Sequence, residues 1–268
     1  MIKAFCLVSD FRFDRIAKWA KNSFEYTNPG IELIIFDLND PKYAHYDFHK
    51  WNQDTINHEF RVLNPYGILK NIAALELMEK EGIDTLIMLG ADVITVGSFD
   101  KALEVTDVDI LTSRDIGSAP YMPLNPDVQV VFGKTFLQKT IEIYMQQMQQ
   151  YTLQHYHMHT YQEMALMNYV CNEGLVRHRP LHAVYGSIEE CFNKNVRNAV
   201  EMTFQESTEK VIALHSFDVI TIHVQTGLGS FKEAEFNQKL FGCMNTSPAF
   251  SDQGVRTFIE KITKDNIW

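Results

Sequence analysis

The sequence predicts an α/β protein with a mostly parallel, mixed central sheet flanked by helices. Apolar runs of strand length alternate with helical stripes, and a strand, a helix and a second strand fit within residues 1–36, which is the opening of a parallel α/β unit. No internal repeat, low-complexity segment or linker divides the chain. We therefore expect a single domain over residues 1–268.

The first predicted unit begins with residues 2–9, an apolar run typical of a strand that is buried on both faces. Segment 13–26 carries a helical apolar stripe, and an Asn-Pro-Gly sequence ends it before a second strand over 31–36. Residues 37–64 are polar and lack periodicity, so they form either a functional loop or a poorly ordered segment.

The next unit consists of a helix over residues 65–80 and a buried strand over 84–89. Gly82 follows the helix, where a glycine suits a C-terminal cap. The strand leads directly into the short run 90–96, which contains the candidate site residue Asp92.

The rest of the chain continues the same alternation, which keeps the whole sequence within one α/β arrangement. Each later segment has either strand-like or helical apolar periodicity. Strands are expected near 108–111, 128–132, 211–214 and 219–224, and helices near 134–149, 160–172, 232–241 and 252–263.

Charge and cysteine content restrict the partners and the compartment. The formal net charge is -10, which disfavours binding of nucleic acid over a broad surface. The four cysteines form no CxxC pair, which fits reduced thiols in a cytoplasmic protein. The apolar run at the N-terminus is too short for a signal-peptide core or a membrane span.

Asp92 follows the predicted strand 84–89 at the edge where an open α/β sheet binds its ligands. An acid at such a place is, by itself, more often part of a turn. Lys70 lies in the preceding helix, where it is equally well a surface lysine or an anion contact. No G-x-G-x-x-G follows the first strand and no P-loop motif occurs, which disfavours a dehydrogenase or a P-loop enzyme.

Five stretches of the sequence carry a resemblance to a known family: 70–76, 86–96, 124–131, 161–168 and 222–227. Together they resemble the GT-A glycosyltransferases, most closely the family 8 enzymes and related nucleotide-diphospho-sugar transferases. The family's D-x-D motif corresponds to Gly90-Ala91-Asp92, so that the first acid of the motif is a glycine here. The resemblance implies a Rossmann-like GT-A domain, and it rests on the order of the matches because unrelated α/β domains have no reason to repeat that order.

The resemblance also implies roles for individual residues. Gln162 would lie beside the anomeric carbon and Glu163 beside the hydroxyls of the donor sugar, with Asp92 as the third catalytic residue. Without the resemblance, Gln162 and Glu163 are simply capping residues of a helix. Contacts to the donor and its nucleotide are expected from Val8, Ser9, Asp10, Lys70, Ala91, Asp115, Asn125 and Gly227.

A divalent cation is the cofactor that the resemblance implies. Negative charge collects on the departing diphosphate, and a bound cation stabilises it as a Lewis acid. Asp92 and His223 are the expected ligands of Mn²⁺ or Mg²⁺, with His215 as a substitute for His223. Because Gly90 supplies no carboxylate, weak metal dependence, with cationic side chains neutralising the diphosphate, is the alternative.

The expected function is transfer of a sugar from a nucleotide diphosphate donor, UDP in the first place, to an acceptor hydroxyl, with the retention that family 8 implies. The acceptor is a glycan, a protein or another hydroxyl compound, while a modified base of phage DNA is disfavoured by the acidic charge. The glycine at position 90 motivates the alternative of a nucleotide-sugar-binding module with weakened catalysis. Another doubly wound enzyme, such as a nucleotidyltransferase, and a structural protein are the remaining alternatives.

Overall fold

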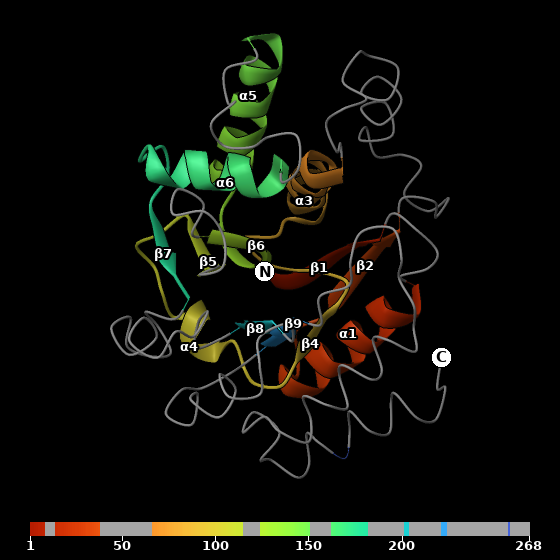
Figure 1. Cartoon of the computed structure of the whole chain (residues 1–268). Helices are drawn as coiled ribbons and strands as arrows, with labels where there is room; N and C mark the ends of the chain where they lie inside the picture. The colour runs from red at the N-terminus through yellow and green to blue at the C-terminus, as the bar shows by residue number, and fades with distance from the viewer. Residues whose placement is uncertain are drawn as a thin grey trace.

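The computed structural model describes residues 1–8, 14–37, 66–114, 124–150, 162–181, 201–203, 221–223 and residue 257. These form a six-stranded sheet in the order β2-β1-β3-β6-β5-β7 and a three-stranded sheet in the order β4-β9-β8 (Figure 1). The larger sheet consists of β1 (Ile2–Val8), β2 (Leu33–Asp37), β3 (Thr85–Leu89), β5 (Ile110–Arg114), β6 (Leu124–Phe132) and β7 (His178–Pro180).

The larger sheet is mixed and mostly parallel, as predicted. β1 pairs in parallel with β2 and β3, and β5 pairs in parallel with β7. β6 runs antiparallel between β3 and β5, and Leu89 at the end of β3 pairs with Val128. The residues at the beginning of β6 therefore reach the same edge of the sheet as the residues that follow β3.

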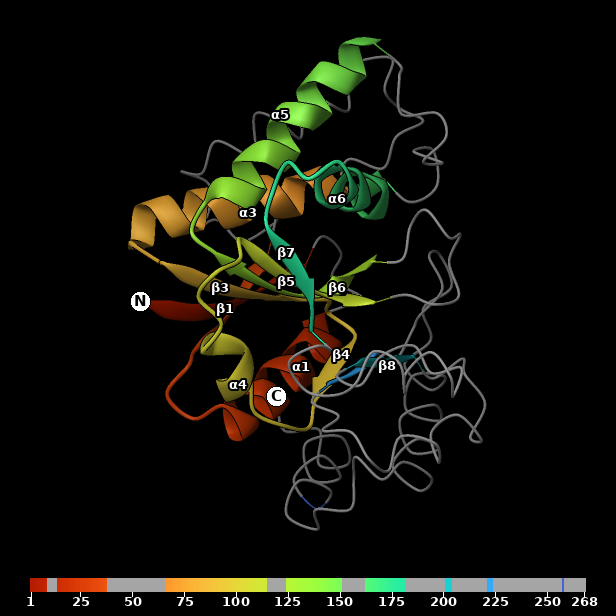
Figure 2. The same cartoon turned by 90° about the vertical axis from the view of Figure 1, so that its left-hand side faces the viewer.

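Helices cover both faces of the larger sheet (Figures 1 and 2). Alternate residues of β1 show the two cores: Phe5 packs in the cluster with α3, α5 and α6, whereas Ala4 and Cys6 pack in the cluster with α1 and α4. All three residues are fully buried, so β1 is apolar on both faces. The helices are α1 (Asp14–Thr27), α3 (Tyr66–Glu81), α4 (Asp100–Leu103), α5 (Thr135–Gln150) and α6 (Gln162–Asn172).

The smaller sheet contains β4, the strand that follows β3 in the chain. β4 (Val93–Thr95) pairs antiparallel with β9 (Thr221–His223), which pairs in parallel with β8 (Glu201–Thr203). The backbone N–H of Thr95 donates to Ser23 Oγ of α1 over 3.1 Å. This bond attaches β4 to the helical layer and fixes where the chain goes after Asp92.

The helix expected over residues 65–80 and the strand over 84–89 are confirmed by α3 and β3. Gly82 ends α3 with a φ of 64°, which supports the predicted cap. β6 begins four residues earlier than its predicted start at residue 128, and β7 was not predicted at all. The strand expected near 211–214 and the helix near 232–241 lie outside the described residues, as does nearly all of the one near 252–263.

Candidate functional site

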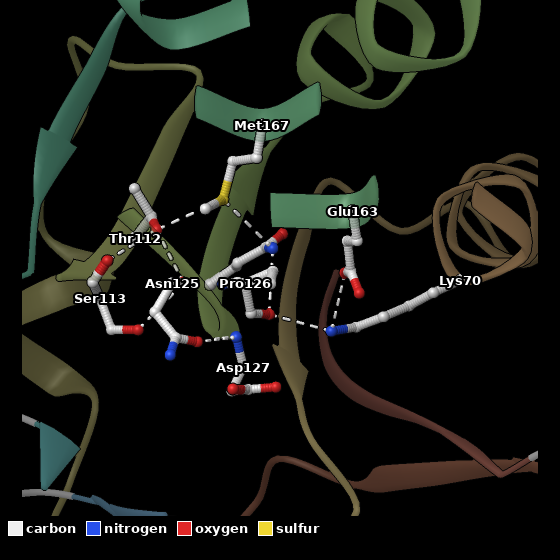
Figure 3. Close-up of polar contacts among 9 residues, drawn as sticks. Lys70, Thr112, Ser113, Asn125, Pro126, Asp127, Glu163 and Met167 are labelled. Atoms are coloured by element: carbon white, nitrogen blue, oxygen red, sulfur yellow. Dashed lines mark hydrogen bonds and ion pairs between the residues drawn. The ribbon is translucent and has the colours of Figure 1, made fainter. Parts of the chain in front are cut away.

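Lys70 is a buried cation at the centre of the candidate site. Its Nζ donates a hydrogen bond to the carbonyl oxygen of Pro126 over 2.9 Å and lies 3.1 Å from Glu163 Oε1 (Figure 3). Only 7% of the residue is exposed, so the interpretation as a surface lysine is wrong. Lys70 joins three elements at one point, because it comes from α3, Pro126 from β6 and Glu163 from α6.

Burial and charge act in opposite directions on this lysine. Burial alone would lower the pKa of Lys70, but the charges of Glu163 and Asp127 outweigh it, and the pKa is raised above its ordinary value. The pKa of Glu163 is raised by burial and by Asp127, against the influence of Lys70. Lys70 therefore remains a cation at neutral pH, held between carboxylates that come from two different elements.

The beginning of β6 is fixed by side chains instead of regular strand pairing. The pairing with β5 breaks at Thr112 and Ser113, where the register shifts from Gln129 to Asn125. The hydroxyls of Thr112 and Ser113 both donate to the Asn125 carbonyl, over 3.1 and 3.0 Å. The Gln129 amide donates to the Pro126 carbonyl over 3.0 Å, so this oxygen has two donors. The irregularity is thus a well-bonded feature of the strand.

Asp127 is held next to the turn after β3. Its N–H donates to Asn125 Oδ1 over 2.8 Å, and its carbonyl accepts the N–H of Gly90 over 2.8 Å. A Cβ placed on Gly90 would lie 3.1 Å from Asp92 Oδ1 and 3.3 Å from Asp127 Oδ1. The carboxylates of Asp92 and Asp127 therefore converge on the space that a side chain at position 90 would fill.

Asp127 is a residue that sequence reasoning missed. The available signal was an acid in a stretch that is otherwise mostly apolar, whereas the resemblance pointed to Asn125 in that stretch. The amide oxygen of Asn125 accepts the backbone N–H of Asp127, and Asn125 itself is only 8% exposed.

Of the two expected metal ligands, Asp92 lies in the turn directly before β4 and His223 is the last residue of β9. His223 pairs with Val93, the residue directly after Asp92. The backbone positions therefore bring residues 92 and 223 together at the edge of the sheet. Among the residues whose side chains the structure describes, no group of three or more histidine, cysteine, aspartate or glutamate side chains is arranged to hold a metal. The side chain of His223 is outside that set.

Some of the remaining predicted residues lie in the part of the chain that the structure describes, and the others lie outside it. Val8 ends β1 opposite Asp37, and Ala91 lies in the turn between β3 and β4. Gln162 begins α6, next to Glu163, but its side chain is not described. Ser9, Asp10, Asp115, His215 and Gly227 lie outside the described residues.

Cys6 lies beneath the site in β1. Burial raises the pKa of its thiol to about 12, with a lowering influence from Lys70 and a raising influence from Asp92. The thiol is therefore neutral near pH 7 and acts as a small apolar group. Lys70 and Asp92 therefore both lie close enough to Cys6 to act on its thiol electrostatically.

Comparisons with known proteins agree on the fold. No protein-family model matches the sequence, and no curated protein matches it in sequence. The structure is similar to a glycosyltransferase involved in the glycosylation of the major capsid of PBCV-1, with a TM-score of 0.54 and 10% identity over 90% of this chain and 98% of that chain. It is also similar to the galactosyltransferase LgtC in complex with donor and acceptor sugar analogs, with a TM-score of 0.51 and 14% identity over 96% and 95% of the two chains. The predicted GT-A fold is thereby confirmed.

None of the described helices is long and apolar enough to cross a membrane.

Proposed function

We propose that this chain is a glycosyltransferase that moves a sugar from a nucleotide diphosphate donor, a UDP-sugar, to an acceptor hydroxyl with retention of configuration. The observation that carries the proposal is the meeting of Lys70, Glu163, Asp92 and Asp127 at one edge of a GT-A sheet. Carboxylates beside a fixed buried cation suit a polar, charged substrate, since groups held in place need little reorganisation when charge develops.

Glu163 is the residue that we assign to the donor sugar. Its position at the start of α6 is fixed by Lys70, and its side chain keeps 20% of its surface exposed. Sugar hydroxyls are good donors to a carboxylate, and a fixed acceptor orients the ring. Gln162 precedes it in the same turn, where we propose that it lies beside the anomeric carbon.

Asp92 and His223 are the residues that we propose hold Mn²⁺ or Mg²⁺. A carboxylate and an imidazole form a donor set that suits Mn²⁺, and Asp92 Oδ1 faces the side-chain space left open by Gly90. When bound, the cation supplies Lewis-acid stabilisation of the departing diphosphate. Residues 92 and 223 lie close in the backbone, which supports the pairing.

The remaining donor contacts are proposed at Val8, Ser9, Asp10, Lys70, Ala91, Asp115, Asn125 and Gly227. Lys70 would act through its charge at a short distance, because its amine is already bound to Pro126 and Glu163. As the acceptor we propose a hydroxyl of a glycan or a protein. The viral neighbour is involved in the glycosylation of the major capsid of PBCV-1, whereas the net charge of -10 disfavours nucleic acid.

We propose a cytoplasmic location. Two of the cysteines, Cys6 and Cys171, are free and buried, as expected in a reducing compartment.

A screen of nucleotide sugars tests the proposed function. Ligands that bind only the folded state raise its melting temperature, so a panel of donors with and without Mn²⁺ identifies base, sugar and metal together. The same donors are then followed for slow hydrolysis without acceptor. We expect a UDP-sugar to stabilise the protein and to be hydrolysed, and Asp92→Asn to lose both effects.

Glu104→Gln is the matched control, since it removes one exposed carboxylate at the C-cap of α4. Binding without any hydrolysis favours the alternative of a binding module, for which Gly90 is the motivating observation. Normal turnover by Asp92→Asn contradicts the site, and the absence of binding by every nucleotide sugar contradicts the proposed function.

A further inference from the structure

Gly90 is a glycine for reasons of space and not of backbone conformation. Four described glycines adopt a positive φ, at positions 30, 82, 133 and 174, and Gly90 is not one of them. Any residue can therefore adopt its backbone. What a side chain at position 90 meets instead is Asp92 Oδ1 at 3.1 Å, Asp127 Oδ1 at 3.3 Å and Val93 Cγ2 at 3.3 Å from its Cβ. Two of these three neighbours are carboxylate oxygens.

The two oxygens lie within 3.3 Å of one point, although Asp92 belongs to the turn after β3 and Asp127 to β6. Mg²⁺ and similar hard cations bind carboxylate oxygens at about 2.0–2.1 Å, so two oxygens this close to a common point can share one ion after small side-chain rotations. The turn at Gly90 also borders Val93, which pairs with His223. Both carboxylates therefore lie close to the pairing of β4 with β9, and β9 ends at His223, the proposed imidazole ligand.

Asp127 is held at this place by its backbone. The Gly90 N–H binds its carbonyl, the Asn125 amide binds its N–H, and the preceding carbonyl of Pro126 accepts bonds from both Lys70 and Gln129. Side chains whose backbone is fixed on both sides lose little freedom when they bind a ligand. The bonds therefore preorganise the carboxylate beside the turn.

On the basis of the proposed function, we propose that Asp127 supplies the second carboxylate of the cation site, in place of the acid that is absent at position 90. The Asp127 carboxylate comes from β6, and the absence of a side chain at Gly90 provides the space for it. Asp92 and Asp127 together would hold the divalent cation, so that the site keeps two acidic ligands although the D-x-D motif keeps one.

Mn²⁺ binding without nucleotide tests the assignment, with free Mn²⁺ measured by its electron paramagnetic resonance signal. Asp127→Asn keeps the size of the side chain and leaves the backbone bonds of residue 127 in place. We expect it to weaken Mn²⁺ binding by about tenfold or more, similar to Asp92→Asn. Glu104→Gln, which removes an equal charge elsewhere, is expected to bind Mn²⁺ like the wild type.

An exchange variant, Gly90→Asp with Asp127→Ala, gives a positive test. Its backbone at position 90 accepts a side chain, and removal of the Asp127 carboxylate clears one of the close contacts. We expect this variant to recover most of the Mn²⁺ affinity that Asp127→Ala alone loses. Circular dichroism and the melting temperature establish that each variant is folded.

The outcomes separate this assignment from the proposed function. Weaker Mn²⁺ binding by Asp127→Asn together with recovery in the exchange variant supports the role of Asp127. Wild-type Mn²⁺ affinity in Asp127→Asn, or no Mn²⁺ binding by the wild-type protein, overturns it. Failure of the proposed function is detected differently, as a lack of nucleotide-sugar binding and hydrolysis by the wild-type protein, whatever its affinity for Mn²⁺.

Discussion

Replacement of Lys70 by methionine tests the buried ion pair on which the candidate site depends. The substitution keeps an unbranched chain of similar length but removes the Nζ that bonds the Pro126 carbonyl and lies 3.1 Å from Glu163 Oε1. Glu163 is then left as a largely buried carboxylate with no cation at that position. Removal of one partner from a buried pair costs about 3–5 kcal/mol, because the other charge remains desolvated.

The lower end of that range applies here. The side chain of Glu163 keeps 20% of its surface exposed, so water compensates part of the lost pairing. The carboxyl can also take up a proton, since its pKa is already raised by burial and rises further without Lys70. We therefore expect a loss of about 3 kcal/mol in the free energy of unfolding near neutral pH. The loss becomes smaller as the pH falls through the raised pKa of Glu163, because the folded state then binds the proton more tightly than the unfolded state.

Urea unfolding followed by circular dichroism, at neutral and at mildly acidic pH, measures both effects. The double variant Lys70→Met with Glu163→Met removes both charges, and we expect it to recover most of the lost stability. Lys134→Met is the control, because Lys134 and Glu79 form an exposed pair at 4.0 Å whose loss should cost less than about 1 kcal/mol. A cost below about 1 kcal/mol for Lys70→Met, or a double variant less stable than the single one, would refute the reasoning.

Two further substitutions test the surroundings of the site. Asn168 is fully buried, and its side chain forms hydrogen bonds with both backbone groups of Leu124 and with the Met164 carbonyl. Asn168→Ala is therefore expected to lower the free energy of unfolding, measured in urea, by about 2–4 kcal/mol. A cost near zero would show that these bonds do not fix the start of β6. Hydrogen bonds from Arg177 hold the pKa of Asp109 below its ordinary value, so this pair stabilises the fold above the ordinary pKa of an aspartate and loses its effect as the pH falls through the lowered value. The difference in melting temperature between wild type and Asp109→Asn should therefore shrink in strong acid, and a difference that is independent of pH would contradict the assignment.

The elements that the sequence predicts well are those with a strong local pattern. β1, β3 and α3 are apolar or periodic runs, and Gly82 marks the end of α3 because a glycine readily adopts the positive φ of a helix cap. β7 could not be predicted, because three residues of mixed polarity become a strand only through their pairing with β5.

The site was predictable only in part. The order of motifs predicts Asp92 and His223 as metal ligands, and the pairing of β4 with β9 brings their backbones together. The burial of Lys70 was not predictable, because a lysine is usually exposed and its two partners come from distant segments. Asp127 was missed for the same reason, since its position beside Gly90 depends on the pairing of β3 with β6.

The close approach at Gly90 has an evolutionary consequence. An acid gained at position 90 while Asp127 is present would crowd three carboxylates around one turn, and an acid lost at position 127 while Gly90 is present would leave a single one. Related sequences should therefore change the two positions together, with an acid at one of them and a small residue at the other. Such paired changes would show how the position of an acidic ligand can move from the turn after one strand to the neighbouring strand of the sheet.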